Sequence, residues 1–550
     1  ILSLGFRARF AAPSPAGPCR ASGRMAAPRK SAPVYPHCRA LHNGRTMLHR
    51  RALVLSILVL ASCGLGYELI SSALSSYLLG DSILQFSSVI GCYLFAMGIG
   101  SWLAKFVEDD DVLDRFVDIE LLVGLLGGVS AALLFVVFAW LAAPFRAALY
   151  ALVLALGLLI GMEIPLVMRA FQQRRQAFRH TVSEVLTFDY LGSLAVSLIF
   201  PLVLAPRLGL LRTSFLFGLL NACVALWTTH LFRDEIRNVR GKLMRASLVI
   251  GLLVAGFALS DRITHWAEHG VYGDETIYSE TTPYQRIVLT QWHDDMRLYL
   301  NGNLQFSSRD EHRYHEALIH PTIEALPWAK RVLVLGGGDG LAVRELLKHR
   351  NLEQITLVDL DPAMTKLFST SAPLVKLNQG SLKDPRVHVI NDDAVRWLES
   401  NADVYDAIVV DFPDPTNFGL GRLYSVPVFR LLARHLSENG YAVIQSTSPY
   451  FAPHAYWTII ATLHEAGLNT WPYHCYVPSF GDWGFVIAGK RRDFTVPTHY
   501  SVPTRWLDAQ TAAEMFHFPA DMPALPMSPN ELNDQPLVRR FDDDWKHVLR

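Results

Sequence analysis

The amino-acid sequence predicts a multi-span α-helical membrane domain followed by a doubly wound α/β domain. Long apolar runs fill residues 52–260 and disappear afterwards, which explains a mean hydropathy of +0.22 over 550 residues. From residue 331 onward, apolar strands and amphipathic helices alternate, as in a parallel sheet covered by helices. A chain of this length exceeds what one hydrophobic core organises, so we expect at least two domains.

Residues 1–46 are expected to lie outside both domains as a disordered or non-native extension. They contain no Asp or Glu, are rich in Ala, Pro, Ser and Arg, and begin with Ile. Such a segment is either a transit-like extension or translated upstream sequence. We favour the second interpretation, because Met47 and the following "LHRRALVLSILVL" resemble a bacterial start with basic residues before a membrane span.

Seven apolar windows are long enough, or nearly so, to supply the roughly 20 residues of a membrane-spanning helix. They lie at residues 52–76, 84–104, 119–141, 147–168, 186–205, 213–230 and 244–260. The small residues of "AMGIGSW" and "GLLGGVS" predict close packing between helices.

Three carboxylates, Glu68, Glu163 and Asp189, lie inside these windows or at their edges. Ionisable groups are costly in lipid, so they suggest a functional site such as an amine or proton pathway. The alternative, which we favour, is that they cap helix ends or pair with Arg residues of the bundle.

Basic residues in short loops predict the orientation of the helices. Residues 49–51, 169–180 and 233–245 are strongly basic and belong on the cytoplasmic side. Seven crossings would then place the C-terminal half outside. The chemistry that the soluble half is expected to perform uses substrates of the cytoplasm. We therefore expect that the short 244–260 window does not cross the membrane, and that the soluble half faces the cytoplasmic side of a bacterial inner membrane.

Composition excludes several functions. The chain has 50 basic and 50 acidic residues, so no overall field favours nucleic acid as a partner. The six cysteines form no CxxC pair, so neither a metal site nor a disulfide framework is predicted.

The soluble half opens with a small antiparallel β-unit, predicted from "YQRIVLTQW" and "MRLYLNGNLQF" with its Asn-Gly turn. A helix through "DEHRYHEALIHPTIEAL" follows, and strands then alternate with helices from "RVLVLGGG" to "YAVIQST". Ligands bind at the carboxyl ends of strands in such sheets. The loops carrying Asp339, Asp359, Asp393 and Asp411 should therefore line one edge.

The glycine loop after the first of these strands favours a nucleotide ligand. Gly336, Gly338 and Gly340 do not complete the dinucleotide pattern, because Leu341 follows them. Asp359, about 20 residues after the loop, suits the two hydroxyls of a ribose. No Lys-Ser/Thr pair follows the glycines, so a triphosphate is disfavoured, and an adenosine carried by a sulfonium, as in S-adenosylmethionine chemistry, fits better.

Asp339 lies in the middle of this loop. Its carboxylate would repel the amino-acid carboxylate of S-adenosylmethionine but attract the bare aminopropyl ammonium of the decarboxylated compound. The alternative is that Asp339 caps the helix that starts at Gly340. The sequence does not separate the two roles.

Six ordered blocks resemble spermidine synthase, a polyamine aminopropyltransferase, over about residues 278–490. They are "TPYQRIVL", "LYLNGNLQFSSRDEHRYHEALIHP", "LGGGDGLAVREL", "LVDLDP", "INDDAVRWL" and "VVDFPDP" with "LYSVPVF". The whole chain resembles the bacterial membrane-fused form. The resemblance implies a Rossmann-like, class I methyltransferase-like fold. It also implies transfer of the aminopropyl group of decarboxylated S-adenosylmethionine to an amine such as putrescine, giving spermidine and methylthioadenosine, with no cofactor or metal ion.

The resemblance also implies roles for individual residues. Asp411 matches the catalytic acidic residue, and Asp414 matches its amine-binding neighbour. Tyr314, His315 and Asp339 should surround the amines, with Gln305 nearby. The donor should contact Gln285 and Asp359 through its thioadenosine part, and Asp393 and Ala394 through its adenine. Each of four residues has an alternative role that needs no ligand. Gln285 and Gln305 would be polar residues of the hairpins, His315 would be a histidine on a helix face, and Asp393 would be an N-cap.

Two departures put the acceptor amine in doubt. Phe412 and Pro413 replace the small polar residues that the soluble enzymes usually carry between the two aspartates, and "TNFGLGRLYS" lacks the usual Gly-Pro. The rival interpretations are an S-adenosylmethionine-dependent methyltransferase and a non-catalytic polyamine transporter or sensor.

The expected organisation has four parts after the extension. They are a transmembrane domain at 47–260, a linker with the β-unit and a helix at 261–330, the catalytic domain at 331–490 and a C-terminal tail at 491–550. The expected partners are a diamine, the decarboxylated donor and the lipid bilayer, without nucleic acid, and homo-oligomerisation is left open.

Overall fold

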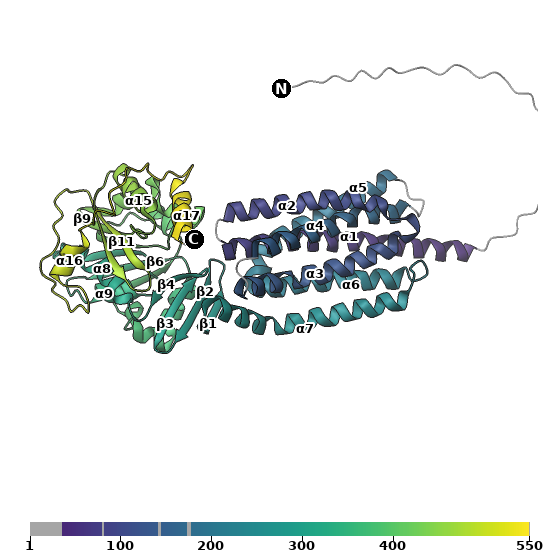
Figure 1. Cartoon of the computed structure of the whole chain (residues 1–550), viewed down its shortest axis with the longest axis horizontal. Helices are drawn as coiled ribbons and strands as arrows, with labels where there is room; N and C mark the ends of the chain where they lie inside the picture. The colour runs from purple at the N-terminus through teal and green to yellow at the C-terminus, as the bar shows by residue number, and fades with distance from the viewer. Residues whose placement is uncertain (1–35, 80–81, 141–144, 173–177, 549–550) are drawn as a thin grey trace, which may run out of the picture. The chain divides into compact units, whose positions relative to one another are not determined.

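The computed structural model describes residues 36–79, 82–140, 145–172 and 178–548 (Figure 1). Most of the expected N-terminal extension lies outside the described residues. Helices dominate the chain as far as residue 272, and two β-sheets with their covering helices follow.

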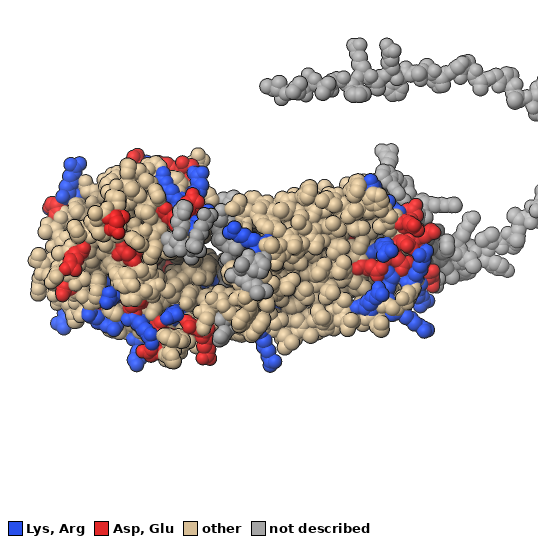
Figure 2. Space-filling view, viewed as in Figure 1, with Lys and Arg blue, Asp and Glu red and all other residues tan. Residues whose placement is uncertain are grey.

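The first part contains the apolar windows. Its long helices are α1 (Pro36–Leu79), α2 (Ser82–Leu103), α3 (Val112–Trp140), α4 (Phe145–Gln172), α5 (Phe178–Ile199), α6 (Ala205–Leu231) and α7 (Val239–Tyr272). Within the described residues, six helical segments are long and apolar enough to cross a membrane. Figure 2 shows a broad surface of these helices that carries almost no Lys, Arg, Asp or Glu, with charged residues gathered at one end.

The fifth and sixth apolar windows belong to one continuous stretch, Val182–Leu231, which has 50 residues. A π-helical turn, Phe200–Leu204, joins α5 to α6, and Gly209 breaks the helical geometry with φ 75° and ψ 171°. A straight helix of that length would measure about 75 Å, more than twice the roughly 30 Å of a hydrocarbon core. The bend therefore separates two segments that the count of six treats as one.

The helix that contains the last apolar window is longer than the window itself and is among those long and apolar enough to cross a membrane. Helix α7 has 34 residues and runs along α3. Lys242 near its start forms an ion pair with Asp114, and Trp266 near its end stacks on Trp140. The helix is longer than the window because it continues through polar residues after residue 260, where hydropathy no longer marks it.

Glycines allow the close helix packing that the sequence predicts. A Cβ atom on Gly100 of α2 would lie 1.9 Å from the carbonyl oxygen of Leu158 on α4. On Gly128 of α3, it would lie 2.5 Å from a methyl carbon of Leu253 on α7. Both positions lie in the two small-residue motifs. Backbone approaches backbone at Gly100, whereas at Gly128 the missing side chain makes room for Leu253.

A four-stranded antiparallel sheet of order β1-β2-β3-β4 opens the second part. Its strands are β1 (Glu275–Thr281), β2 (Arg286–Trp292), β3 (Asp295–Leu300) and β4 (Asn303–Ser307). Asn301 and Gly302 join β3 to β4 with φ values of 50° and 83°, which is the turn that the Asn-Gly pair predicts. The predicted antiparallel β-unit is confirmed.

A seven-stranded sheet of order β10-β11-β9-β8-β5-β6-β7 follows. The strands are β5 (Arg331–Gly336), β6 (Gln354–Asp359), β7 (Val387–Asn391), β8 (Tyr405–Asp411), β9 (Leu436–Gln445), β10 (Asn469–Val477) and β11 (Gly481–Gly489). Strands β5 to β9 are parallel, as predicted, whereas β11 runs antiparallel to β9 and to β10. The sequence prediction ended at β9, because the hairpin β10–β11 lacks an intervening helix.

Two apolar clusters cover the two faces of this sheet. The helices are α8 (Glu311–Glu324), α9 (Leu341–Leu347), α10 (Pro362–Thr370), α11 (Ala372–Leu377), α12 (Ala394–Ser400), α13 (Phe418–Gly421), α14 (Val426–His435), α15 (Pro453–Glu465), α16 (Ala509–Met515) and α17 (Pro536–Val548). The C-terminal segment contributes to these clusters, since Leu507 and Leu537 are fully or almost fully buried. The Glu316 carboxylate also accepts hydrogen bonds from the backbone N–H groups of residues 505–507.

Candidate active site

The carboxyl ends of β5 and β8 lie side by side at the point where the strand order reverses. Strand β5 pairs with β6 on one side and with β8 on the other, and Gly336 is in register with Asp411. The chain leaves β5 for one half of the sheet and returns to the other half through β8. Such a switch point leaves a crevice between the departing loops, and ligands bind there in open α/β sheets.

The glycine loop brings its backbone against two carboxylates. Gly337 has φ 67°, and a Cβ atom there would lie 3.1 Å from Oδ2 of Asp411. A Cβ atom on Gly338 would lie 2.6 Å from Cγ of Asp359. A side chain at either position would push the neighbouring carboxylate away from the glycine loop. Glycine is therefore needed to let the loop approach these carboxylates, as well as for its backbone conformation.

Asp411, at the end of β8, is hydrogen-bonded to Tyr314 of α8, whose hydroxyl donates to Oδ1 at 2.6 Å. Burial raises the pKa of Asp411, while the nearby His315 and the hydroxyl of Tyr314 lower it in part. The Tyr314 ring lies between aromatic rings, with Phe485 5.2 Å away between centroids. Packing therefore fixes the hydroxyl that faces the carboxylate.

A buried ion pair holds His315 in place. Nδ1 of His315 lies 2.9 Å from the carboxylate of Glu311, which accepts two hydrogen bonds from Arg344 at 2.8 and 2.9 Å. Burial opposes a charge on His315, but Glu311 raises its pKa above the ordinary value. Sequence reasoning missed Glu311 and Arg344. They are 33 residues apart, and the only signal for Glu311 is its i, i+4 spacing from His315.

The structure shows the helix-cap contact of Asp339, one of the two roles that the sequence left open. Its Oδ1 accepts a hydrogen bond from the backbone N–H of Leu341 at 2.9 Å, which is the predicted helix-cap contact. Its Oδ2 has no recorded partner among the described residues. Burial raises the pKa of Asp339 to about 6, and the negative charge of Asp411 contributes to the increase. The cap occupies one oxygen of Asp339, and binding of a cation by the other oxygen stays a prediction.

Asp414 is held by two polar side chains that sequence reasoning missed. Nε2 of Gln445 donates to Oδ1 at 3.3 Å, and Oγ1 of Thr447 donates to Oδ2 at 3.4 Å. Burial raises the pKa of Asp414 to about 7. Thr447 has φ 57°, an uncommon conformation for a β-branched residue. Strained backbone of this kind is often found at functional sites, and here it directs a hydroxyl toward an acidic group.

Asp359, at the end of β6, accepts hydrogen bonds from the backbone N–H groups of Gly338 at 3.0 Å and Asp361 at 2.9 Å. Burial raises its pKa to about 6. The side-chain amide of Gln285 donates to Asp361 at 3.0 Å, and the Thr282 hydroxyl donates to the same oxygen at 2.8 Å. Asp361 thus links the β-unit to the large sheet, which no local sequence pattern indicated.

Three other predicted residues, Gln305, Asp393 and Ala394, have their own contacts. The Asp393 carboxylate accepts hydrogen bonds from the backbone N–H groups of Val395 and Arg396 and forms an ion pair with Arg422 at 2.9 Å. Asp393 is therefore the N-cap of α12, which is the alternative role that the sequence allowed. Ala394 is buried at the start of that helix. The amide of Gln305 donates to carbonyl oxygens of its own strand, β4. Their contacts with a ligand stay predictions.

Phe412, the departure noted in the sequence, has its ring in the apolar cluster on one face of the sheet. The side chain is 7% exposed and packs on Tyr424 with 6.3 Å between ring centroids. Its carbonyl oxygen accepts hydrogen bonds from Gln445 at 2.5 Å and from Tyr424 at 3.1 Å. The bulky residue therefore anchors the loop that carries Asp414.

The edge of the sheet is strongly acidic. Among the described Lys and Arg residues, none forms an ion pair with Asp339, Asp359, Asp411 or Asp414. No group of His, Cys, Asp and Glu in the described residues has the arrangement of a metal site. Unpaired buried carboxylates of this kind suit an organic cation.

Known proteins resemble this chain both in the catalytic domain and over most of its length. The family model described as the spermine/spermidine synthase domain matches residues 311–499. Polyamine aminopropyltransferase 2 of Ralstonia nicotianae is 62% identical over 503 residues, covering 90% of this chain and 99% of that protein. The polyamine aminopropyltransferase of Leptospira interrogans is 48% identical over 500 residues, covering 90% and 99%. The chain belongs to the spermine/spermidine synthase family.

This membership extends beyond the catalytic sheet. Polyamine aminopropyltransferase 1 of Streptomyces coelicolor is 42% identical over 509 residues, covering 90% of this chain and 95% of that protein. These alignments are far longer than the matched domain at 311–499, so the relatives share the helical part as well. The chain is a transferase of the spermine/spermidine synthase family with apolar helices before its catalytic domain, as the sequence resemblance predicted.

Proposed function

We propose that the protein transfers the aminopropyl group of decarboxylated S-adenosylmethionine to putrescine, which gives spermidine and methylthioadenosine. The observation that carries this proposal is the set of buried carboxylates, without Lys or Arg partners among the described residues, at the switch point of the sheet. A donor with a sulfonium and an ammonium, together with a diammonium acceptor, supplies the missing positive charge. The names of the relatives support the same reaction class.

Asp411 is the base in this proposal. An alkylamine is protonated near neutral pH and is a poor nucleophile until a proton leaves. The Asp411 carboxylate accepts that proton, and Tyr314 keeps the carboxylate oriented through its 2.6 Å hydrogen bond. The amine nitrogen then forms a bond to the methylene carbon next to the sulfonium. The carbon–sulfur bond breaks, its electron pair goes to sulfur, and neutral methylthioadenosine leaves.

The remaining acidic groups bind the two substrates. Oδ2 of Asp339 is expected to bind the aminopropyl ammonium of the donor. Asp359 is expected to bind the ribose. Gln285 is expected at the thioadenosine part, and Asp393 and Ala394 at its adenine. Asp414 is expected to bind the acceptor's ammonium, and its bonds to Gln445 and Thr447 orient it. Because the Phe412 ring packs into the core, putrescine is not excluded by that substitution.

The test uses the full-length protein purified in detergent. Incubation with decarboxylated S-adenosylmethionine and putrescine should release methylthioadenosine and spermidine in equal amounts. Replacing putrescine by spermidine or by diamines of other lengths measures the acceptor preference. Methyl transfer from S-adenosylmethionine, or a lack of methylthioadenosine release with every amine, would contradict the proposal. The Asp411→Asn variant serves as the matched control for release that does not depend on the site.

We also propose that the helices lie in the bacterial cell membrane with the catalytic domain in the cytoplasm. A donor with two cationic groups does not cross a bilayer unaided, so the catalytic domain must be on the side where the donor is made. The basic loops and the full length of α7 favour the opposite side by the positive-inside rule. A reporter fused after the last residue decides between them, and a reporter active only in the periplasm would contradict a cytoplasmic domain.

A further inference from the structure

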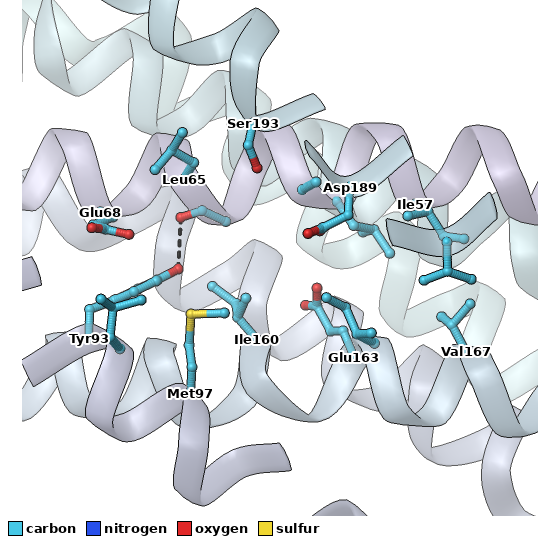
Figure 3. A pocket seen from close by; sticks show the side chains of 16 residues that line it. Ile57, Leu65, Glu68, Tyr93, Met97, Ile160, Glu163, Val167, Asp189 and Ser193 are labelled. Carbon is cyan, nitrogen blue, oxygen red and sulfur yellow. Dashed lines mark hydrogen bonds between the residues drawn. The ribbon is translucent and has the colours of Figure 1, made fainter. Parts of the chain in front are cut away.

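A cavity of about 200 Å³ lies among α1, α2, α4 and α5 in the helical part. Most of its lining is apolar, including Leu65, Met97 and Ile160, but Glu68, Glu163 and Asp189 also line it. Figure 3 shows the carboxylates of Glu163 and Asp189 directed toward one another, with Glu68 farther along the cavity. The three acidic residues that the sequence singled out thus share one space.

The alternative that these carboxylates pair with Arg residues is not supported. Other acidic residues of the helical part have basic partners: Asp109 with Arg169, Asp111 with Arg237, Asp114 and Asp118 with Lys242, and Asp261 with Arg212. Among the described Lys and Arg residues, none pairs with Glu68, Glu163 or Asp189. The cavity therefore differs from these other sites of the helical part, where the acidic charges are balanced by basic residues.

Glu163 gives the independent sign of a ligand. Glu163 is 4% exposed, and its Oε1 has no hydrogen-bond partner in the part of the chain that the structure describes. The carboxyl group of the fully buried Glu120 lies against that of Glu163 and accepts a hydrogen bond from Asn221 at 3.2 Å, so two acidic groups without a basic partner among the described residues meet here. Sequence reasoning missed Glu120, although it lies within the third apolar window. A buried acceptor without a partner is costly, and the cost is removed when a donor enters the cavity.

The shape of the lining selects the type of cation. On α1 it extends from Ile57 to Glu68, which is about 16 Å at 1.5 Å per residue. The volume is below the roughly 300 to 1,000 Å³ of pockets for drug-sized ligands. The described residues contain no converging group suited to a metal ion. A long, thin, mostly apolar space with acidic groups at separate points matches a flexible chain of methylenes with ammonium groups along it.

We propose that this cavity binds a linear polyamine cation such as spermidine. The choice of a polyamine rests on the proposed function, since acceptor and product of the catalytic domain belong to that class. One ammonium lies between Glu163 and Asp189 and donates to the free Oε1. A second lies near Glu68 beside the Tyr93 ring, whose face favours a cation and whose hydroxyl is fixed on the Gly64 carbonyl at 2.7 Å.

The test is equilibrium dialysis of radiolabelled spermidine against the full-length protein in lipid nanodiscs. The Asp414→Asn background removes the expected acceptor contact in the catalytic domain, so that the remaining binding reports the helical part. We expect about one spermidine per chain in this background. Adding Glu163→Gln should weaken that binding about tenfold or more, because it removes the partner of a charged donor. Adding Glu108→Gln, an exposed carboxylate outside the cavity, should leave it unchanged.

A second variant guards against misfolding. Ser193→Phe keeps every carboxylate but fills the cavity from α5, and it should also abolish binding in the Asp414→Asn background. Unchanged binding in both cavity variants, or no binding to the Asp414→Asn protein, would overturn the proposal. Transferase activity is measured separately on the protein with an intact Asp414. A protein that binds spermidine in the helical part but transfers no aminopropyl group would refute the proposed function alone.

Discussion

Substitution of Tyr314 by Phe should shift the pH dependence of catalysis. The Tyr314 hydroxyl donates to Asp411 at 2.6 Å, which stabilises the charged carboxylate and lowers its pKa in part. A hydrogen bond to a charged group contributes about 1.5 to 3 kcal/mol. At about 1.4 kcal/mol for each tenfold change, its loss moves the acidic limb of the profile upward by about one to two pH units. The ring stays, so its packing on Phe485 is kept.

The assay is kcat/KM for the acceptor amine from pH 5.5 to 9.5, measured as methylthioadenosine release. Removing the hydrogen bond favours the protonated form, so the variant should be slow at low pH and recover at high pH. Tyr476→Phe is the control, because Tyr476 is 59% exposed and lies on β10. A loss of rate that is equal at every pH would mean that Tyr314 positions substrate without tuning Asp411, and an unshifted acidic limb would refute the reasoning.

Three further predictions concern the acidic edge. Asp411→Asn keeps the size of the side chain but accepts no proton, so turnover should fall by about 10² to 10⁴ fold while donor binding, measured by calorimetry, stays nearly intact. A parallel loss of donor affinity would make Asp411 a binding residue. Asp339→Asn retains an oxygen for the Leu341 cap, so it should weaken the decarboxylated donor about 10- to 150-fold and methylthioadenosine much less. Equal weakening of both ligands would favour a role as a cap only. Burial raises the pKa of Asp414 from an ordinary 3.8 to about 7 in the folded protein. The folded state therefore gains stability from binding this proton below pH 3.8, and it loses that stability as the pH rises through 7. Asp414→Asn should therefore stabilise the catalytic domain by up to about 4 kcal/mol at pH 8 and hardly at pH 4, and thermal melts that show no such pH dependence would contradict the burial of a charged group.

The supports of the catalytic groups could not be predicted from the sequence. Gln445 and Thr447 reach Asp414 from β9 and the turn that follows it, across more than 30 residues of chain. Arg344 reaches Glu311 from another helix in the same way. Residues of these types occur throughout the chain, and no spacing separates the few that lie against a carboxylate from the many that lie on the surface.

The sequence by itself determined the order of the elements and the position of the reactive edge. Hydropathy separated the helical part, and the alternation of strands and helices placed Asp339, Asp359 and Asp411 at strand ends, because side chains after parallel strands share one edge whatever the details of packing. Tertiary structure alone decided which oxygens are free. It assigned one oxygen of Asp339 to a helix cap, directed Gln285 to Asp361, buried the ring of Phe412, extended α7 past its apolar window, and brought Glu68, Glu163 and Asp189 to one cavity. These outcomes depend on contacts between distant segments, and a local pattern of residues carries no information about which partner each polar atom meets.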